Sequence, residues 1–366
     1  MNPRELQFIQ NNFQQYYRDH PVAPPDMGAR EFGFGWQKKI DYRHAAFSSH
    51  RELAEFLVRD APLYASYSTA YYQFPAKKPV PEKGYLGADV VFDLDKTNQA
   101  HDHRPFFCRA CLDLIHGEAL RLKKLLKEDF GFESLLVFSG QKGFHLHVRS
   151  DEVRNFSKEA RRQLADYAGA EGLDAETLFP TGKTELDSRQ SRAGSFRGPG
   201  KESSGWPGRV YALMKEGVEK KDAKNLRALG LSKKNIEYVL TYPEEALKNL
   251  DAGNWNAFCD KPPLKVLDAM RFVQTDKAVT FDLSRLIRLP ESLHGSTGFA
   301  AKTLSGDSFR VEDAVVFSQE SVLEIKILET VEFQLFKPYA FQANRLEGVP
   351  LSVAIFLLCQ GKAAFP

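Results

Sequence analysis

The sequence predicts a chain that mixes β-strands with α-helices and carries polar side chains at the ends of its strands. Short apolar runs at 88–95 and 132–148 alternate as strands do, whereas 3–17 and 203–263 have helical spacing. With 366 residues, of which 43% are hydrophobic, the chain is long enough for one large domain with an insertion.

Two aspartates mark the first of these strands. The run from Ala88 to Asp95 is short, apolar and β-branched, and Gly87 precedes it. Because side chains alternate along a strand, Asp93 and Asp95 project to the same face, with Cα atoms about 6.5–7 Å apart. Two carboxylates at this spacing can share two divalent cations about 3.5–4 Å apart. The alternative is a pair of solvated carboxylates where a strand meets its turn.

A strand–turn–strand unit follows. Its turn is Gly140-Gln141-Lys142-Gly143, and in the strand after it His145 and His147 fall on one face. Ser139, the backbone N–H groups of the turn and Lys142 suit the phosphates of a nucleotide. An ordinary hairpin with two half-buried histidines is the other interpretation.

A third polar segment comes later in the chain. Asp276 lies near the end of a predicted short strand in 272–280, and residues 281–288 have helical spacing that ends before Pro290. The segment can contribute a third carboxylate, two guanidiniums and His294. On spacing alone, Asp282 competes with Asp276 for the role of third carboxylate.

These motifs, taken together, resemble the small (catalytic) subunit of archaeo-eukaryotic DNA primases, of the archaeal type. The resemblance covers nearly the whole chain, and the three motifs have the order and rough spacing of that family. An earlier block with Glu31 and Arg43 also matches. The resemblance implies an α/β (α+β) primase-type core of mixed β-sheets flanked by helices, with a small inserted helical subdomain and a zinc knuckle.

The resemblance also implies roles for individual residues. Asp93, Asp95 and Asp276 would bind the catalytic Mg²⁺ or Mn²⁺ ions, and the family register favours Asp276 over Asp282. The remaining residues would shape the nucleotide site or contact the triphosphate: Glu31, Arg43, Ser139, Lys142, His145, Arg288 and His294. Gln141 departs from the eukaryotic members, which tend to have a basic residue there.

The cysteines indicate a second metal site. Of four cysteines only Cys108 and Cys111 are clustered, and His101 and His103 precede them in a His-x-His-x₄-Cys-x₂-Cys string. Four such ligands are typical of a structural Zn²⁺ site, and the family carries a zinc knuckle at this position. His116 is a substitute ligand, and solvated histidines in a loop are the alternative. Cys259 and Cys359 are isolated and read as buried thiols.

The activity that the resemblance implies is DNA-directed synthesis of short RNA primers, and of DNA where deoxyribonucleotides are accepted, by two-metal nucleotidyl transfer. The partners would be single-stranded DNA, ribo- and deoxyribonucleoside triphosphates, and the iron–sulfur large subunit of a heterodimer. The alternatives are a primase-like repair polymerase and a non-catalytic DNA-binding subunit. No apolar run approaches the roughly 18–20 residues that span a bilayer, and no secretory signal is seen, so we expect a cytoplasmic, nucleoid-associated protein.

The motif order predicts the domain organisation. Residues 1–202 and 264–366 would form the catalytic core, with the knuckle at 101–111, and 203–263 a helical insertion. Strands are expected within 309–336, irregular structure at 338–346 and a last helix at 351–359. The net charge is only +2, and the Gly- and Arg-rich run 189–201 either tracks a template backbone or is a plain connection.

Overall fold

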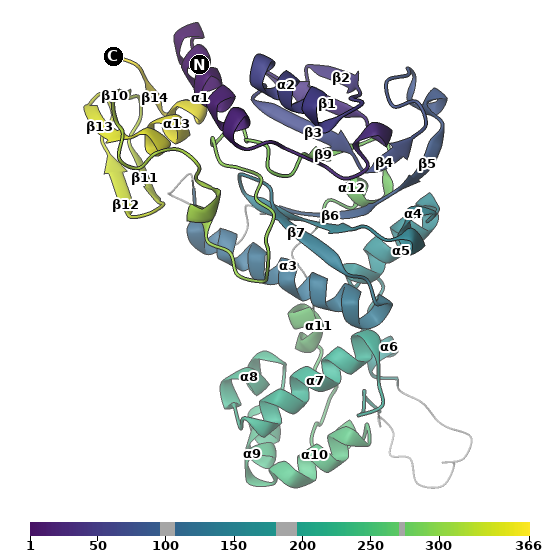
Figure 1. The fold of residues 1–366 in the computed structure, drawn as a ribbon. Helices are drawn as coiled ribbons and strands as arrows, with labels where there is room; N and C mark the ends of the chain where they lie inside the picture. The colour runs from purple at the N-terminus through teal and green to yellow at the C-terminus, as the bar shows by residue number, and fades with distance from the viewer. Residues whose placement is uncertain (96–106, 181–195, 271–274) are drawn as a thin grey trace. The chain divides into compact units, whose positions relative to one another are not determined.

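The computed structural model describes residues 1–95, 107–180, 196–270 and 275–366. The chain divides into two compact units (Figure 1). The first comprises Met1–Ala165 and Val273–Pro366, and the second is the continuous segment Asp166–Phe272. The boundaries predicted from the sequence, 203 and 263, both fall inside the second unit.

The first unit begins with the helix that the sequence predicts. Helix α1 spans Pro3–Asp19, and Asn2 and Glu5 cap its first turn reciprocally. Its buried side chains, among them Phe13 and Tyr17, lie on one face, and α1 packs against α2 (His50–Asp60). The helix forms because these apolar residues recur at helical spacing and can be buried together.

A four-stranded antiparallel sheet has the order β2-β1-β3-β9. Its strands are β1 (Phe32–Gly35), β2 (Tyr42–Ala45), β3 (Tyr64–Ser68) and β9 (Leu286–Arg288). The helix predicted over 281–288 is therefore wrong. Helix α12 covers Lys277–Phe281 and ends at Asp282, whose carboxylate accepts hydrogen bonds from Ser284. The next residues pair with β3, and that tertiary pairing overrides their helical spacing.

A three-stranded antiparallel sheet carries the first two motifs, in the order β6-β8-β7. Strands β6 (Val90–Asp95), β7 (Ser134–Phe138) and β8 (Gly143–Val148) confirm the three strands that the sequence predicts. Residues 85–88 form a separate strand, β5 (Tyr85–Ala88), paired with β4 (Ala70–Tyr72).

The long helix α3 (Arg109–Phe130) covers one face of this sheet, where the ring of His116 meets that of Phe144 (Figure 1). That face is apolar, because Phe92, Leu94 and Leu146 share it with Phe144 and are fully buried. The alternating residues point to the other face, so every polar motif residue of β6 and β8 faces away from α3.

Directly after β8 come the helices α4 (Asp151–Arg154) and α5 (Lys158–Ala168), the second of which continues past the boundary at 165. At the end of the chain, β10 (Val322–Ile327), β13 (Leu346–Pro350) and β14 (Ala363–Ala364) form one sheet.

A separate hairpin joins β11 (Val331–Gln334) and β12 (Pro338–Phe341). The prediction of irregular structure over 338–346 holds for 342–345 but is wrong for 338–341, where the ring of Tyr339 stacks on Phe333 and stabilises this hairpin, and at Leu346, where β13 begins. The last helix, α13, spans Leu351–Cys359 as predicted, and its apolar side chains are buried almost throughout.

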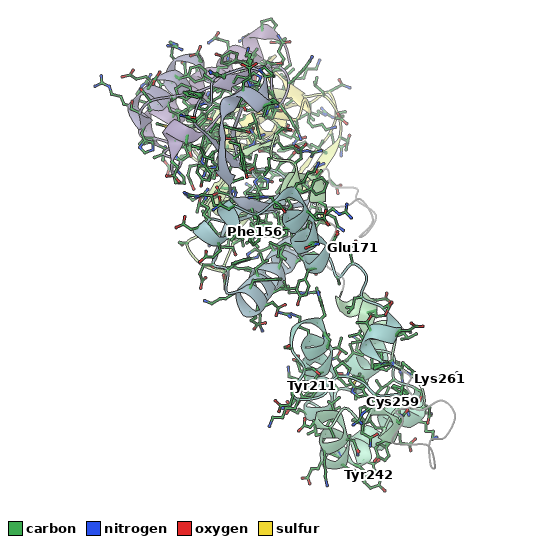
Figure 2. All side chains as sticks on the ribbon, turned by 90° about the vertical axis from the view of Figure 1, so that its right-hand side faces the viewer. Phe156, Glu171, Tyr211, Tyr242, Cys259 and Lys261 are labelled. Atoms are coloured by element: carbon green, nitrogen blue, oxygen red, sulfur yellow. The ribbon has the colours of Figure 1, made fainter. Side chains whose placement is uncertain are left out.

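Helices are the only regular secondary structure in the part of the second unit that the structure describes (Figure 2). Its helices are α6 (Ala175–Leu178), α7 (Gly205–Glu219), α8 (Ala223–Ala228), α9 (Lys233–Thr241), α10 (Pro243–Asp251) and α11 (Lys265–Met270). Trp255 is fully buried, and its indole donates a hydrogen bond to the carbonyl of Pro199. Tyr211 bonds Asp251 and thereby ties α7 to α10.

Candidate active site

The two aspartates of β6 lie on the face of the sheet that α3 does not cover. Across the β6–β8 pair, Asp93 lies opposite His145 and Asp95 lies opposite Gly143. The Oδ1 atom of Asp93 is 3.5 Å from His145 Nε2, and Asp93 retains only 18% of its side-chain exposure. Asp95, at the end of the strand, is exposed. The strand thus holds one carboxylate in a largely buried position and a second at its rim.

Backbone contacts bring Asp276, which carries the third carboxylate, next to Asp93. The N–H of Asp276 donates to the carbonyl of Asp93 at 3.0 Å, and Thr275 makes an antiparallel bridge with Leu94. Asp276 caps α12, which is tied to β6 by a hydrogen bond from Thr280 to Val91. Asp276, rather than Asp282, is therefore the third aspartate beside Asp93.

The carboxylates repel one another. Burial, reinforced by the charge of Asp276, raises the pKa of Asp93 to about 6. Burial and then the charge of Asp93 also raise the pKa of Asp95. Moreover, Asp93 Oδ1 is buried and accepts no hydrogen bond in the described part of the chain. A cation placed here would remove both costs.

The Asp276 carboxylate is engaged elsewhere. It accepts hydrogen bonds from the Ala278 N–H at 3.0 Å and from Arg285 Nη1 at 2.9 Å. Consistent with this, no three His, Cys, Asp or Glu side chains among the described residues converge as a metal would require. The three aspartates are brought together, but Arg285 holds the third.

The turn between β7 and β8 packs directly against Asp95. A Cβ atom on Gly143 would lie 2.3 Å from Asp95 Oδ1 and 2.1 Å from the carbonyl oxygen of Leu94, so only glycine permits this approach. Ser139 Oγ accepts a hydrogen bond from the Gly143 N–H at 3.2 Å. Lys142 is exposed on this turn, and its charge offsets a small part of the rise in the pKa of Asp95 that burial and Asp93 cause.

Arg288, His145 and His294 form a buried basic cluster next to this turn. Burial, together with the charge of Arg288, lowers the pKa of His145 to about 4 and that of His294 well below its usual value. Both rings are therefore neutral at pH 7. Because His294 Nδ1 accepts a hydrogen bond from the Ser296 N–H at 3.2 Å, its hydrogen is on Nε2, where it can be donated. Burial also lowers the pKa of Arg288 to about 10, which leaves it charged.

Glu31 and Arg43 make a separate ion pair at 2.6 Å in the four-stranded sheet region. Glu31 is completely buried and also lies 3.5 Å from the ammonium group of Lys83, which is buried as well. Arg43 bonds the carbonyl of Ser284, close to the segment that carries Arg285. Glu31 is thus inaccessible itself and fixes Arg43, which keeps 32% of its side-chain exposure.

Comparison with known proteins agrees with this arrangement. The model of the DNA primase small subunit family matches residues 92–305, which include all three aspartates. The chain belongs to the DNA primase small subunit family. It is 32% identical to the DNA primase small subunit PriS of Methanothrix thermoacetophila, over 99% of each chain. It is 33% identical to PriS of Methanocella arvoryzae, over 100% of each chain.

The polymerase domain of Mycobacterium tuberculosis ligase D, in complex with DNA, is a more distant likeness. It is 13% identical, covers 82% of this chain and 84% of that one, and superposes with a TM-score of only 0.37. A TM-score this low supports no conclusion about the fold or function of this chain. As a primase small subunit, the chain is the catalytic, nucleotide-transferring subunit of a DNA primase that acts on a DNA template.

Two of the four predicted zinc ligands of this primase subunit, His101 and His103, are outside the described residues. Cys108 precedes the first turn of α3 and Cys111 lies within that turn, where it is 2% exposed. His116 packs its ring against Phe144 and Phe309.

The described helices include none that is long and apolar enough to cross a membrane.

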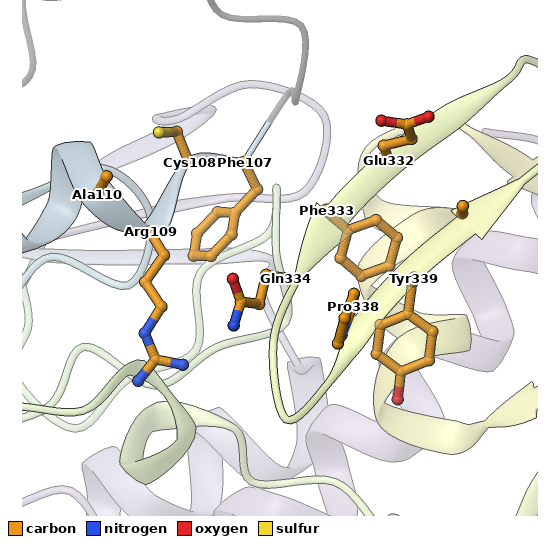
Figure 3. A pocket seen from close by; sticks show the side chains of 10 residues that line it. Phe107, Cys108, Arg109, Ala110, Glu332, Phe333, Gln334, Pro338 and Tyr339 are labelled. Atoms are coloured by element: carbon orange, nitrogen blue, oxygen red, sulfur yellow. The ribbon is translucent and has the colours of Figure 1, made fainter.

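A cavity of about 430 Å³ adjoins Cys108 and lies between the start of α3 and the β11–β12 hairpin (Figure 3). Its walls are largely apolar, with Phe107 on one side and Phe333 and Tyr339 on the other. Of the residues that the sequence singles out, Cys108 lines it and the aspartates do not. The candidate site residues of β6 and β8 thus lie on the face of the β6-β8-β7 sheet that α3 does not cover rather than in this cavity.

Two features of the site are not predicted by the sequence. Arg285 holds the Asp276 carboxylate, although its position in the sequence shows only that it is basic. Burial dominates the shifted pKa values of Asp93, Asp95 and His294, and the charge of Lys39, in the turn between β1 and β2, opposes the rise at the two aspartates and adds to the fall at His294. Nothing in the residues around Lys39 signals this, because a turn lysine is usually solvated.

Proposed function

We propose that this primase subunit joins nucleotides by a two-metal reaction in which Asp93, Asp95 and Asp276 hold Mg²⁺ or Mn²⁺. The observation that carries the proposal is the buried Asp93 Oδ1, which has no hydrogen-bond donor among the described residues, with Asp95 on the same strand face and the backbone N–H of Asp276 bonded to the carbonyl of Asp93. Hard oxygen ligands of this kind suit both cations. When bound, the metals would activate the primer hydroxyl and stabilise the leaving oxygens.

The engagement of Asp276 with Arg285 fits this proposal as a resting arrangement. The pair is 45–49% exposed on both sides, so its separation costs little. Turning the carboxylate from Arg285 toward Asp93 would complete the set of ligands. Arg285 would then be available to a phosphate or to Asp282, which lies 3.7 Å away.

The remaining residues would bind and orient the nucleotide. Ser139, Lys142 and the N–H groups of their turn would contact the triphosphate, and His145, Arg288 and His294 would do so from the buried cluster. Since both histidines are neutral, they would act as hydrogen-bond donors, whereas Lys142 and Arg288 supply charge. The 3′-hydroxyl of the primer attacks the α-phosphate, the bond to the β-phosphate breaks, and pyrophosphate leaves.

A structural Zn²⁺ held by His101, His103, Cys108 and Cys111 belongs to the same proposal. Such a site would anchor the segment that follows the Asp93–Asp95 motif to the first turn of α3. Four protein ligands leave no open position, so this ion would have no part in the reaction.

We further propose that the chain works as a heterodimer with a large subunit that carries an iron–sulfur cluster. A cluster of this type needs four thiolates. With Cys108 and Cys111 assigned to zinc, Cys259 and Cys359 remain, one in each unit. Burial raises the pKa of both thiols, which disfavours the thiolate form that ligates iron.

A primer-synthesis assay on single-stranded DNA tests the function directly. The isolated chain, with Mg²⁺ or Mn²⁺, should extend a supplied primer with ribo- or deoxyribonucleotides and should start new primers efficiently only after the large subunit is added. An absence of template-dependent extension in both metals would refute the proposal. Efficient initiation by the isolated chain would refute only the heterodimer.

A further inference from the structure

Tyr64, the first residue of β3, packs against two members of the buried basic cluster. The guanidinium group of Arg288 lies over its ring, with 5.1 Å between the guanidinium carbon and the ring centroid. The imidazole of His294 meets the same ring nearly at a right angle, with centroids 5.5 Å apart and an angle of 83° between the planes. One half-buried side chain thus contacts both residues that β9 and the loop after it contribute to the cluster.

The loop that carries His294 is held against Tyr64 by two further contacts. The hydroxyls of Tyr64 and Ser296 lie 2.9 Å apart and share a hydrogen bond, and the Ser296 N–H is the donor to His294 Nδ1. A Cβ on Gly295 would lie 2.9 Å from Tyr64 Cζ and 2.8 Å from the carbonyl oxygen of Leu63, so glycine permits this close approach. Tyr64 therefore helps to fix the imidazole whose Nε2 can donate.

Arg288 is a buried cation without a counter-charge. It is 9% exposed, and its Nη1 donates to the carbonyl of Ala65 at 3.2 Å. Among the residues that the structure describes, it forms no ion pair with a carboxylate. A buried charge in this situation is costly, and the negative face of the Tyr64 ring offsets part of the cost.

An aromatic partner suits a cation that has to bind a phosphate. A carboxylate beside Arg288 would compete with the phosphate for the N–H donors of the guanidinium group, as Asp276 does at Arg285. An aromatic ring attracts the cation but leaves those donors unoccupied. Tyr64 can thus hold Arg288 in place and keep it available to the nucleotide.

We propose that Tyr64 is a positioning residue that holds Arg288 and His294 in the orientation that binds the triphosphate of the incoming nucleotide. The proposal rests on the role proposed above for these two residues in nucleotide binding. Tyr64 acts through them, because its ring packs on both and its hydroxyl bonds Ser296. The competing explanation is that Tyr64 only stabilises the fold. Loss of the ring would then change unfolding but not nucleotide affinity.

The first test compares Tyr64→Leu, Tyr64→Phe and Tyr339→Leu in primer extension at saturating metal. We expect Tyr64→Leu to raise the nucleotide KM and the inhibition constant for inorganic pyrophosphate by about tenfold, with kcat within about threefold of wild type. Tyr64→Phe keeps the ring and should restore both constants to within about threefold of wild type. Tyr339→Leu is the matched control, since Tyr339 is a buried tyrosine of the same unit beside Lys337, and it should stay within about twofold.

A double-mutant cycle with Arg288→Ala shows whether Tyr64 acts through Arg288. The nucleotide Kd is measured directly, so that inactive variants are included. In the Arg288→Ala background, Tyr64→Leu should raise Kd by less than in the wild-type background, because one of its two partners is gone. Fully additive effects would overturn the proposal, as would an unchanged Kd in Tyr64→Leu. If Arg288→Ala itself binds the nucleotide as wild type does, the nucleotide role of Arg288 is wrong, and the role of Tyr64 falls with it.

Trifluorophenylalanine in place of Tyr64 provides a variant that preserves packing, so the test remains decisive if Tyr64→Leu does not fold. Its ring has nearly the shape of phenylalanine but a weaker negative face. The fluorinated variant should bind the nucleotide about threefold or more weakly than Tyr64→Phe. Equal affinities would overturn the proposal, because the ring would then only fill space.

Discussion

Gly143 faces Asp95 across the β6–β8 pair at a distance that leaves no room for a side chain. The pairing of β6 with β8 thus places Gly143, from one motif, against Asp95, a candidate metal ligand from another. The glycine is required by the backbone approach itself, since a Cβ there would meet both the Asp95 carboxylate and the Leu94 carbonyl.

Gly143→Ala should therefore displace Asp95 and lower the extension rate by about a hundredfold, since misplacement by about 1 Å has effects of this size. Gly117→Ala is the matched control, because Gly117 lies in α3 with no atom within 4 Å of an added Cβ. It should keep full activity and gain about 0.5–1 kcal/mol of stability. Steady-state extension kinetics and urea unfolding check both, and a fully active Gly143→Ala variant would contradict the geometry.

Asp93→Asn and Asp95→Asn should abolish nucleotide incorporation while preserving the fold. In the presence of chelator, the melting temperature of Asp93→Asn should equal or exceed that of wild type, because the variant loses a carboxylate that burial and Asp276 destabilise. Activity within about tenfold of wild type in a metal-titrated assay would rule out the assignment.

Glu31→Ala should destabilise the first unit by about 3–5 kcal/mol, because the buried ammonium of Lys83 and the guanidinium of Arg43 lose their carboxylate. Glu324→Ala, an exposed glutamate on β10, should change stability by no more than about 0.5 kcal/mol. Urea unfolding measures both. If the double variant Glu31→Ala/Lys83→Met is no more stable than Glu31→Ala, the buried ammonium is not the cause.

His147 should make stability depend on pH. Its ring is 1% exposed, and neither nitrogen has a partner among the described residues. Burial, then the charge of Arg149, lowers its pKa well below 6.5. Below pH 6.5 the unfolded chain therefore binds a proton that the folded chain does not, so stability falls as pH falls, whereas above pH 6.5 this residue contributes no slope.

His147→Leu should remove this dependence. Between about pH 6.5 and 5, the free energy of unfolding of wild type should decline more steeply than that of the variant, with an excess slope that approaches about 1.4 kcal/mol per pH unit near pH 5. Urea unfolding at several pH values gives both curves. Parallel curves over this range would show that His147 takes up its proton in the folded state.

One tightly bound zinc per chain is expected after dialysis against a chelator, with His101, His103, Cys108 and Cys111 as ligands. Elemental analysis should find it lost in Cys108→Ser/Cys111→Ser and retained in Cys259→Ala, since Cys259 lies in the second unit. Metal-free wild type with unchanged melting behaviour would refute the site.

The sequence predicted the local parts of the site because they depend on local periodicity. The alternation in 90–95 and 143–148 is sufficient to put Asp93, Asp95 and His145 on one face, and the structure has them so. The sequence also predicted the helices at the two ends of the chain. The helix expected over 281–288 failed because β3 provides hydrogen-bond partners that are distant in sequence.

The sequence around Lys39 and Arg285 does not predict that either side chain acts on the aspartates, because this too depends on partners that are distant in sequence. Whether a turn lysine faces solvent or a carboxylate pair depends on how two sheets pack, and sequence spacing carries no information on that packing. Likewise, the hold of Arg285 on Asp276 depends on where α12 ends and β9 begins.

The bridge between Leu94 and Thr275 has a consequence for the order of events during synthesis. The whole second unit, 166–272, leaves the ribosome between these two strand-like segments. The entropic cost of closing a loop grows only slowly with its length, by about 0.6 kcal/mol per doubling, so the interruption is thermodynamically mild. Kinetically it matters more. With Asp93, Asp95 and Asp276 as the proposed metal ligands, a nascent chain holds two of the three until residue 276 emerges, so on this proposal it copies no template before the intervening unit has been made.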